Sequence, residues 1–222
     1  MSTFRIRSIV TQSIGLVACL LLAALWSSSA SAQRIPVPWP QTAVDHREKI
    51  RGPESPVIGN ADAPITIVSF SDYQCPYCRE LSTNLQHLVE EQPDRIRVIY
   101  RHFAMTPESH AMAEATLCAA DQGRFADYHR LVFGTPGVTV ATLPDLATQL
   151  GLNLEEFRAC TASNRHAKRV DADIREGERL GIQVTPTFFI NGKRVVGSAS
   201  AEKLRDKIAE LVPTVARREG AR

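Results

Sequence analysis

The sequence predicts an α/β domain that is interrupted by an all-helical insertion. The order of the patterns carries this prediction: a strand, a helix and a strand come first, a long helical block follows, and a hairpin and one helix close the chain. The chain has 222 residues, of which 44% are hydrophobic and 23% are charged. This composition allows one substantial core and excludes a disordered tail, a collagen and a small disulfide-stapled toxin.

The first part of the α/β domain is predicted over residues 63–106. Ile65 to Phe70 is apolar at nearly every position, as in a central strand that is buried on both faces. Apolar side chains recur with helical spacing from Cys78 to Leu88, so a helix follows this strand. Residues 95–103 have the composition of a second strand.

Helical patterns fill residues 107–178, which we assign to the insertion. Residues 179–213 return to the α/β domain. Asn191-Gly192 between Thr187–Ile190 and Lys193–Val196 favours a hairpin with a type I′ turn, and a helix with an apolar face follows. Residues 214–222 are expected to be a flexible tail. The helices of the insertion are predicted at residues 111–120, 124–132, 141–149, 154–161 and 167–180.

A cleaved secretory signal is predicted over residues 1–32. Arg5 and Arg7 give a positive start, Ile14 to Trp26 is apolar, and a small-x-small triplet ends at Ala32. The apolar run is short for a bilayer span, and an uncleaved anchor is the alternative. Cleavage near Ala32 would deliver the mature chain to an oxidising compartment, in bacteria the periplasm.

The mature chain has no surplus of positive charge. Residues 33–222 carry equal numbers of basic and acidic side chains, whereas nucleic-acid binders usually carry a basic excess. We therefore expect no nucleic-acid partner. Residues 33–62 are rich in proline and are expected to form an extended arm. An arm of this length is too short for a large dimerisation domain of the isomerase type, so we expect a monomer; a short oligomerising stalk is the alternative.

A Cys-x-x-Cys motif, Cys75-Pro76-Tyr77-Cys78, lies where the first strand passes into the first helix. With Cys75 as the N-cap, Pro76 takes the first helical position, where its missing N–H costs nothing. Cys75 then lies at the exposed helix end, where free N–H groups and the helix dipole favour a thiolate, while Cys78 faces the core. This asymmetry suits thiol–disulfide exchange, with Cys75 as the nucleophile and Cys78 as the resolving thiol.

Two other interpretations of this pair are a structural disulfide and half of a zinc site. Zinc needs two further ligands, and the sequence has no second Cys-x-x-Cys and no paired His motif. Redox chemistry is favoured because a Cys-x-x-Cys beside a strand–helix–strand pattern is its signature. We expect no metal and no soluble cofactor, because the disulfide itself carries the electrons.

Three segments carry a resemblance to a known family: Phe70 to Cys78 (FSDYQCPYC), Arg101-His102-Phe103, and Val184 to Gly192 (VTPTFFING). Together and in this order they resemble the DsbA-like thiol–disulfide oxidoreductases, over most of the mature chain. The resemblance implies a thioredoxin fold with an inserted helical subdomain, and a cis Thr185–Pro186 bond beside the Cys pair. It also implies that the backbone of Thr185 pairs with an extended substrate chain.

Tyr77 departs from the strongest oxidants of that family, which carry a His at this position. Tyr77 can donate a hydrogen bond but brings no positive charge, so we expect a milder oxidant. Asp72, three residues before the motif, is expected to hold the turn or cap the helix; as an alternative, Asp72 or Glu80 accepts a proton from Cys78. Pro76, Tyr77 and Asp72 are therefore the predicted supporting residues of the site.

Cys118 and Cys160 lie on different predicted helices of the insertion. Two buried thiols that face each other in an oxidising compartment are bridged, and relatives with a second bridge support a structural disulfide here. Two unpaired buried cysteines and a redox relay to Cys75 are the alternatives. The fifth cysteine, Cys19, would leave with the signal; a lipoprotein is disfavoured because the apolar run continues beyond it.

These expectations combine into a periplasmic dithiol oxidase. The oxidised Cys75–Cys78 pair would take electrons from unfolded or reduced secreted proteins and leave them with a disulfide. The family implies a DsbB-like membrane quinone reductase as the partner that reoxidises the pair. A disulfide reductase or isomerase of the same fold is the alternative within the enzymes, and a metal-binding protein that uses the Cys pair is the alternative outside them.

Overall fold

Five strands form one sheet in the computed structural model, which describes residues 55–212. The strand order is β1-β3-β2-β4-β5, with β2 parallel to β3 and the other neighbouring pairs antiparallel. β2 is buried along its whole length, as predicted for a central strand. The strands are β1 (Val57–Gly59), β2 (Ile65–Ser71), β3 (Ile96–His102), β4 (Thr187–Ile190) and β5 (Lys193–Val196).

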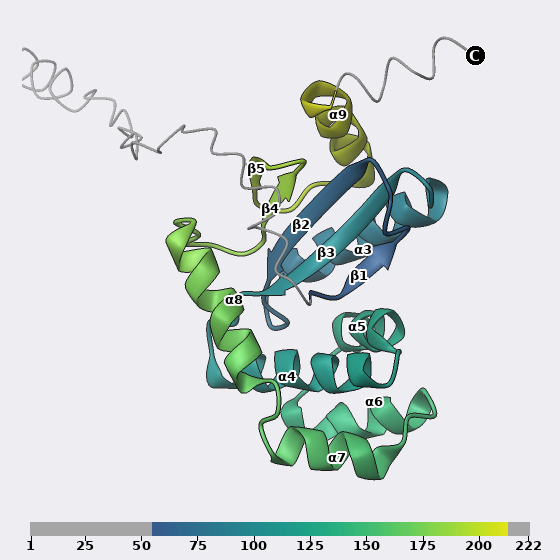
Figure 1. Ribbon diagram of the computed structural model, residues 1–222, viewed down its shortest axis with the longest axis vertical. Coiled ribbons are helices and arrows are strands. Elements are labelled where there is room, and N and C mark those ends of the chain that lie inside the picture. Colours follow the sequence, from purple (N-terminus) through teal and green to yellow (C-terminus); the bar gives the residue numbers. More distant parts are fainter. Residues whose placement is uncertain (1–54, 213–222) are drawn as a thin grey trace, which may run out of the picture. The chain divides into compact units, whose positions relative to one another are not determined.

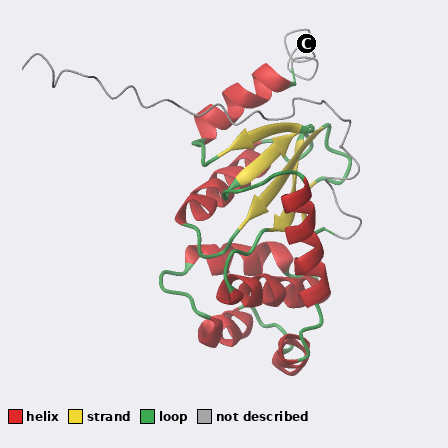
Figure 2. Cartoon of the chain, turned by 90° about the vertical axis from the view of Figure 1, so that its left-hand side faces the viewer, coloured by secondary structure: helices red, strands yellow, loops and turns green. Residues whose placement is uncertain are grey.

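Helices cover both faces of the sheet and extend beyond one end of it (Figures 1 and 2). α3 (Pro76–Glu91) and α9 (Ala201–Leu211) share one apolar core with the sheet, and α8 (Ala167–Arg179) packs on the opposite face. The predicted α/β domain with a helical insertion is confirmed. The remaining helices of the insertion are α4 (Pro107–Asp121), α5 (Phe125–Gly134), a 3₁₀ turn (Val140–Thr142), α6 (Leu143–Gln149) and α7 (Leu154–Ala162).

β1 belongs to the sheet, whereas the sequence placed residues 57–59 in the extended arm that ends at residue 62. Val57 pairs with Ile99 and Gly59 pairs with Arg97, both on β3. The predicted boundary was wrong because a three-residue edge strand is too short to show the alternation that identifies strands. The predicted signal (residues 1–32), the arm up to residue 54 and the predicted tail (residues 214–222) lie outside the described residues.

The hairpin of β4 and β5 forms as predicted, with Asn191 and Gly192 at its turn. Their φ angles of 45° and 84° are the positive values that a type I′ turn requires. Asn191 also fixes the hairpin to the sheet, because its side-chain oxygen accepts a hydrogen bond from the N–H of Thr66 at 2.8 Å. The insertion begins at Pro107, after a Thr106 cap.

α8 lies close to the sheet because a glycine faces it. A Cβ built on Gly177 would lie 2.6 Å from Cε2 of Phe103. One turn earlier on α8, the buried carboxylate of Asp173 accepts hydrogen bonds from Nε of Arg101 at 2.5 Å and from the N–H of His102 at 3.0 Å. The helix and β3 are therefore joined both by close packing and by a buried ion pair.

Two histidines are almost fully buried in this fold: His102 at the end of β3, and His129 on α5. Burial disfavours the charged imidazolium and lowers the pKa of His102 to about 4 and that of His129 to about 3. Both side chains are therefore neutral in the folded protein at neutral pH.

Replacement of Gly177 by alanine is expected to destabilise the protein by about 1–3 kcal/mol, because the added methyl group overlaps the Phe103 ring in a packed core. Gly134→Ala is the matched control, since nothing lies within 4 Å of a Cβ built on Gly134. Urea unfolding of both oxidised variants measures the difference. Equal stability of Gly177→Ala and the wild-type protein would show that α8 can move off the sheet at no cost.

The buried histidines predict a loss of stability at mildly acidic pH. Their pKa values are lowered by folding, so the unfolded chain binds protons first as the pH falls below about 6.5. The stabilisation is complete above that pH and declines toward pH 4, by up to about 1.4 kcal/mol per pH unit for each histidine.

Urea unfolding at about pH 7.5 and about pH 5.5 checks this dependence. His129→Gln should flatten it, whereas His87→Gln, a change on the exposed face of α3, should not. The assignment of the pH dependence to buried histidine would be refuted by an unchanged slope in His129→Gln.

Candidate active site

Cys75 and Cys78 flank the start of α3, directly after the loop that leaves β2. Cys75 is the N-cap, with an extended φ of −81° and ψ of 119°, and Pro76 is the first helical residue. The N–H groups of Cys78 and Arg79 donate to the carbonyl oxygen of Cys75, at 3.1 and 3.2 Å. This is the placement predicted from the sequence, and both cysteines are free thiols in the structure.

The two sulfurs differ in exposure. Cys78 is fully buried and packs in the same apolar core as Tyr73 and helices of the insertion, whereas Cys75 is half-buried at the end of α3. Burial raises the pKa of the Cys78 thiol to about 12. Cys75 instead lies at the N-terminal end of α3, where the helix dipole favours negative charge. One accessible and one sheltered sulfur are what disulfide exchange requires.

The Thr185–Pro186 bond is cis, as the resemblance implied, and its loop lies beside the Cys pair. The Cys75 Sγ donates to the carbonyl oxygen of Thr185 at 3.4 Å. The carbonyl of Pro186 accepts from the N–H of Gly197 at 2.9 Å, which ties the loop to the end of β5. The structure thus brings together two segments that are 110 residues apart in the sequence.

Asp72 holds the turn before the motif and does not cap the helix. Its Oδ1 accepts from the N–H of Gln74 at 2.7 Å, and its Oδ2 accepts from the N–H of Met105 at 2.7 Å and the hydroxyl of Ser109 at 2.8 Å. Its own N–H donates to Sγ of Cys78 at 3.4 Å. Because both carboxylate oxygens are occupied, the geometry favours the structural role over proton acceptance.

A groove of about 390 Å³ adjoins Tyr77 and the Thr185 loop. The Tyr77 side chain is 64% exposed and forms part of its wall. Glu80 also lines this groove; residues two apart on a helix do not face each other, so Glu80 is not placed to take a proton from the buried Cys78. The other lining residues are Gly197, Ser198, Ala199, Ser200 and Lys203.

A buried polar group that sequence reasoning missed lies behind the motif. Nδ1 of His129 is 2.7 Å from the hydroxyl of Tyr73, and its Nε2 is 2.8 Å from the hydroxyl of Ser82. Tyr73 precedes Cys75 by two residues and Ser82 follows Cys78 by one helical turn, so His129 links both sides of the motif to α5. The helical spacing of Ser82 from Cys78 was a signal for its position, whereas nothing local indicated His129.

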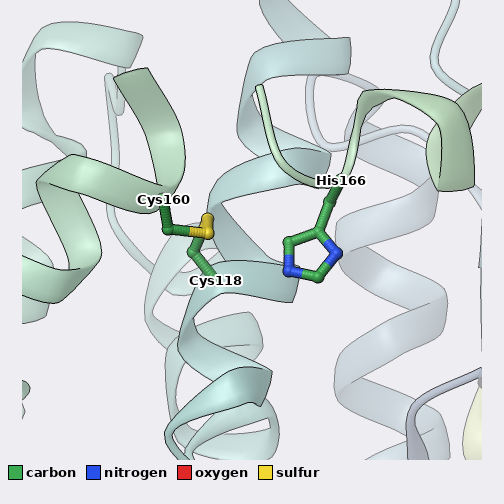
Figure 3. A group of neighbouring side chains, drawn as sticks. All are labelled: Cys118, Cys160 and His166. Atoms are coloured by element: carbon green, nitrogen blue, oxygen red, sulfur yellow. A yellow bond between two sulfur atoms is a disulfide. The ribbon is translucent and has the colours of Figure 1, made fainter. Parts of the chain in front are cut away.

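Cys118 and Cys160 form the predicted disulfide, which joins α4 to α7 across 42 residues of sequence (Figure 3). Both residues are buried. The alternative of two unpaired cysteines is therefore wrong.

The comparisons with known proteins agree with this geometry. Residues 51–210 match a family model described as thioredoxin. A thioredoxin-like oxidoreductase from Silicibacter pomeroyi DSS-3 superimposes with a TM-score of 0.68 at 27% sequence identity, covering 76% of this chain and 98% of that chain. The thiol-disulfide exchange protein alpha-DsbA2 from Wolbachia pipientis superimposes with a TM-score of 0.67 at 22% identity, covering 75% of this chain and 91% of that chain.

A curated relative, the Na(+)/H(+) antiporter NhaA 1 of Salinispora arenicola (strain CNS-205), is 35% identical over 162 residues. The match covers 71% of this chain and 24% of that protein, so the chain spans about a quarter of the length of this relative. Within residues 55–212, none of the helices has the length and apolar character needed to cross a bilayer.

The family match covers most of the chain, and the structure combines the Cys pair, the cis-proline loop and the helical insertion. The chain therefore belongs to the thioredoxin family and has the fold of the DsbA-like thiol–disulfide oxidoreductases.

Proposed function

We propose that this chain is a periplasmic dithiol oxidase that introduces disulfides into secreted proteins. The observation that carries the proposal is the unequal pair at the start of α3: Cys75 is accessible, Cys78 is buried with a raised pKa, and both lie beside the cis Thr185–Pro186 bond. The predicted signal over residues 1–32 supports the periplasmic location.

The reaction begins with a Cys75–Cys78 disulfide. A substrate thiolate attacks Sγ of Cys75, the S–S bond breaks, and Cys78 leaves with the electron pair and takes up a proton, because burial raises its pKa. A second substrate thiolate attacks the substrate sulfur of this mixed disulfide and releases Cys75 as a thiolate. The substrate loses two electrons and gains a disulfide, and the enzyme holds both electrons as a reduced pair.

The surface around Cys75 fits unfolded or reduced secreted proteins as substrates. Tyr77, Met105 and Val184 are large apolar residues with exposed side chains, and unfolded chains present apolar side chains that such residues can cover. An extended substrate segment adds beside the backbone of Thr185, as a strand adds to a sheet edge.

Turnover needs an acceptor for the two electrons, and we propose a DsbB-like membrane quinone reductase. The Cys75–Cys78 pair itself accepts the two electrons and passes them on, so the proposed reaction uses no metal and no soluble cofactor. The protein acts as a monomer in this scheme. Ion transport is not part of the proposal, because the antiporter relative aligns with this chain over only 24% of its own length.

A disulfide reductase or isomerase is the second candidate, and Tyr77 is the observation that favours it. Tyr77 brings no positive charge to the helix end where the Cys75 sulfur lies, so the reduced pair is stabilised less than it would be beside a histidine. A less stabilised reduced form has a lower reduction potential, which shifts the protein from oxidant toward reductant.

Cys75→Ser is expected to abolish the oxidation of a reduced model protein, because no sulfur remains for the substrate to attack. Cys78→Ser should instead trap the substrate on Cys75 as a mixed disulfide, which a non-reducing gel and mass spectrometry detect. The double variant Cys118→Ser/Cys160→Ser is the control, because it keeps the Cys75–Cys78 pair. It should oxidise the substrate under conditions in which circular dichroism shows that the variant is folded. Full activity in Cys75→Ser would exclude the proposed reaction.

The reduction potential of the Cys75–Cys78 pair separates the two candidate directions. A value well above that of thioredoxin, about −270 mV, supports an oxidase, and a value near it supports a reductase. Tyr77→His should raise the potential, by about 30 mV for each tenfold gain in stability of the reduced form, whereas Tyr77→Phe should not raise it. Equilibration with glutathione buffers measures all three proteins, and equal potentials in the Tyr77→His and wild-type proteins would contradict the assigned effect of Tyr77.

A further inference from the structure

His166 lies beside the Cys118–Cys160 disulfide (Figure 3). The two sulfurs and a ring nitrogen of His166 lie within 4.8 Å of one another. Asp121, the last residue of α4, adds a carboxylate: its Oδ2 is 2.9 Å from Nε2 of His166 and 3.8 Å from Sγ of Cys160. His166 is the N-cap of α8 and Cys160 lies on α7, so the group joins three helices of the insertion.

We propose that Cys118, Cys160, His166 and Asp121 bind Zn²⁺ when their disulfide is reduced, so that the disulfide and the metal are alternative ways to close the insertion. Two thiolates, an imidazole and a carboxylate are ligands that zinc takes in tetrahedral sites. This site is separate from the Cys75–Cys78 pair, and the inference does not rest on the proposed function.

The distances in the oxidised protein already approach those of such a site. A tetrahedron with ordinary zinc–ligand bond lengths has edges of about 3.3–3.8 Å between ligand atoms. The 2.9 Å and 3.8 Å separations from Asp121 lie near this range. After reduction the two sulfurs must also move apart to the spacing of two zinc ligands. Rotation of the cysteine side chains can provide this movement without a shift of the backbone, because the two Cα atoms are already 5.9 Å apart.

The charges around the group also suit a divalent cation. Two thiolates and the Asp121 carboxylate outweigh Zn²⁺ by one negative charge, and the Arg165 guanidinium, with Nη1 3.0 Å from Oδ2 of Asp121, balances it. A neutral imidazole offers one ring nitrogen to the ion while its proton stays on the other, and the Asp121 carboxylate offers an oxygen. The side chains of Asp121 and His166 are 37% and 20% exposed, which gives the ion a path to the buried sulfurs.

The formation of the site balances as a two-electron reduction followed by ligand exchange. A dithiol reductant attacks the disulfide, becomes a disulfide itself, and leaves Cys118 and Cys160 as two thiols. Zn²⁺ then displaces the two thiol protons and takes the place of the hydrogen bond between His166 and Asp121, with no change in its own oxidation state. The insertion thereby keeps a covalent or metal cross-link in both redox states.

The test uses the full chain with Cys19→Ser, Cys75→Ser and Cys78→Ser, which leaves Cys118 and Cys160 as its two remaining cysteines. A phosphine reduces the disulfide and is itself oxidised to a phosphine oxide, whose oxygen comes from water. The excess phosphine is then removed under anaerobic conditions. Co²⁺ then reports thiolate coordination through its charge-transfer and ligand-field absorption, and competition with a chromophoric chelator gives the Zn²⁺ affinity. We expect one equivalent to bind the reduced protein and none to bind the oxidised protein.

His166→Gln and Asp121→Asn separate this site from a bare dithiol. His166→Gln should weaken Zn²⁺ binding at least about tenfold, while His110→Gln, a change at another ion-paired histidine of the insertion, should leave it unchanged. Absence of Co²⁺ absorption, or equal Zn²⁺ affinity in His166→Gln and its parent, would overturn the proposal. If the reduced protein has lost its helical circular dichroism, Zn²⁺ must restore it, and failure to do so overturns the proposal equally.

Discussion

The junction between β2 and α3 depends on one buried carboxylate, that of Asp72. Its oxygens accept hydrogen bonds from Gln74, Met105 and Ser109, so a single side chain fixes both the loop before the Cys pair and the start of α4. A buried carboxylate is costly unless its oxygens are hydrogen-bonded, and here both are. These bonds hold the loop that ends at Cys75 and tie it to the start of α4, while Asp173 of α8 joins the insertion to β3 separately.

The insertion contributes to the chemistry of the Cys pair because it buries Cys78. The core that contains Cys78 also contains Tyr73, Met112, Phe133 and Val170, which come from the loop before the motif and from three helices of the insertion. Desolvation is the largest cause of the raised Cys78 pKa. The helical subdomain therefore sets part of the difference between the two sulfurs, in addition to shaping the surface around them.

The features that depend on local pattern were predictable from the sequence. The buried strand β2, the Cys75 cap and the Asn191-Gly192 turn each depend on neighbouring residues, and the cis Thr185–Pro186 bond followed from the resemblance. The features that were missed depend on contacts between distant segments. β1 is identified only by its pairing with β3, and His129 reaches the site from α5, 47 residues after Ser82. The sequence left two roles open for Asp72, holding the turn or capping the helix. Its bond from Gln74 is local, whereas its bonds from Met105 and Ser109 depend on the position of α4.

The two cysteine pairs differ in what their disulfides do to the unfolded chain. A bridge between Cys118 and Cys160 closes a loop across 42 residues and removes much conformational freedom from the unfolded state, which stabilises the fold by up to about 4 kcal/mol. A bridge between Cys75 and Cys78 closes a loop of four residues, most of which the helix start has already ordered. The loss of chain entropy that this bond imposes on the unfolded state is therefore much smaller. Any difference in stability between the oxidised and reduced Cys75–Cys78 pair must then come from the folded state, from how the start of α3 stabilises the reduced sulfurs, and that difference sets the reduction potential.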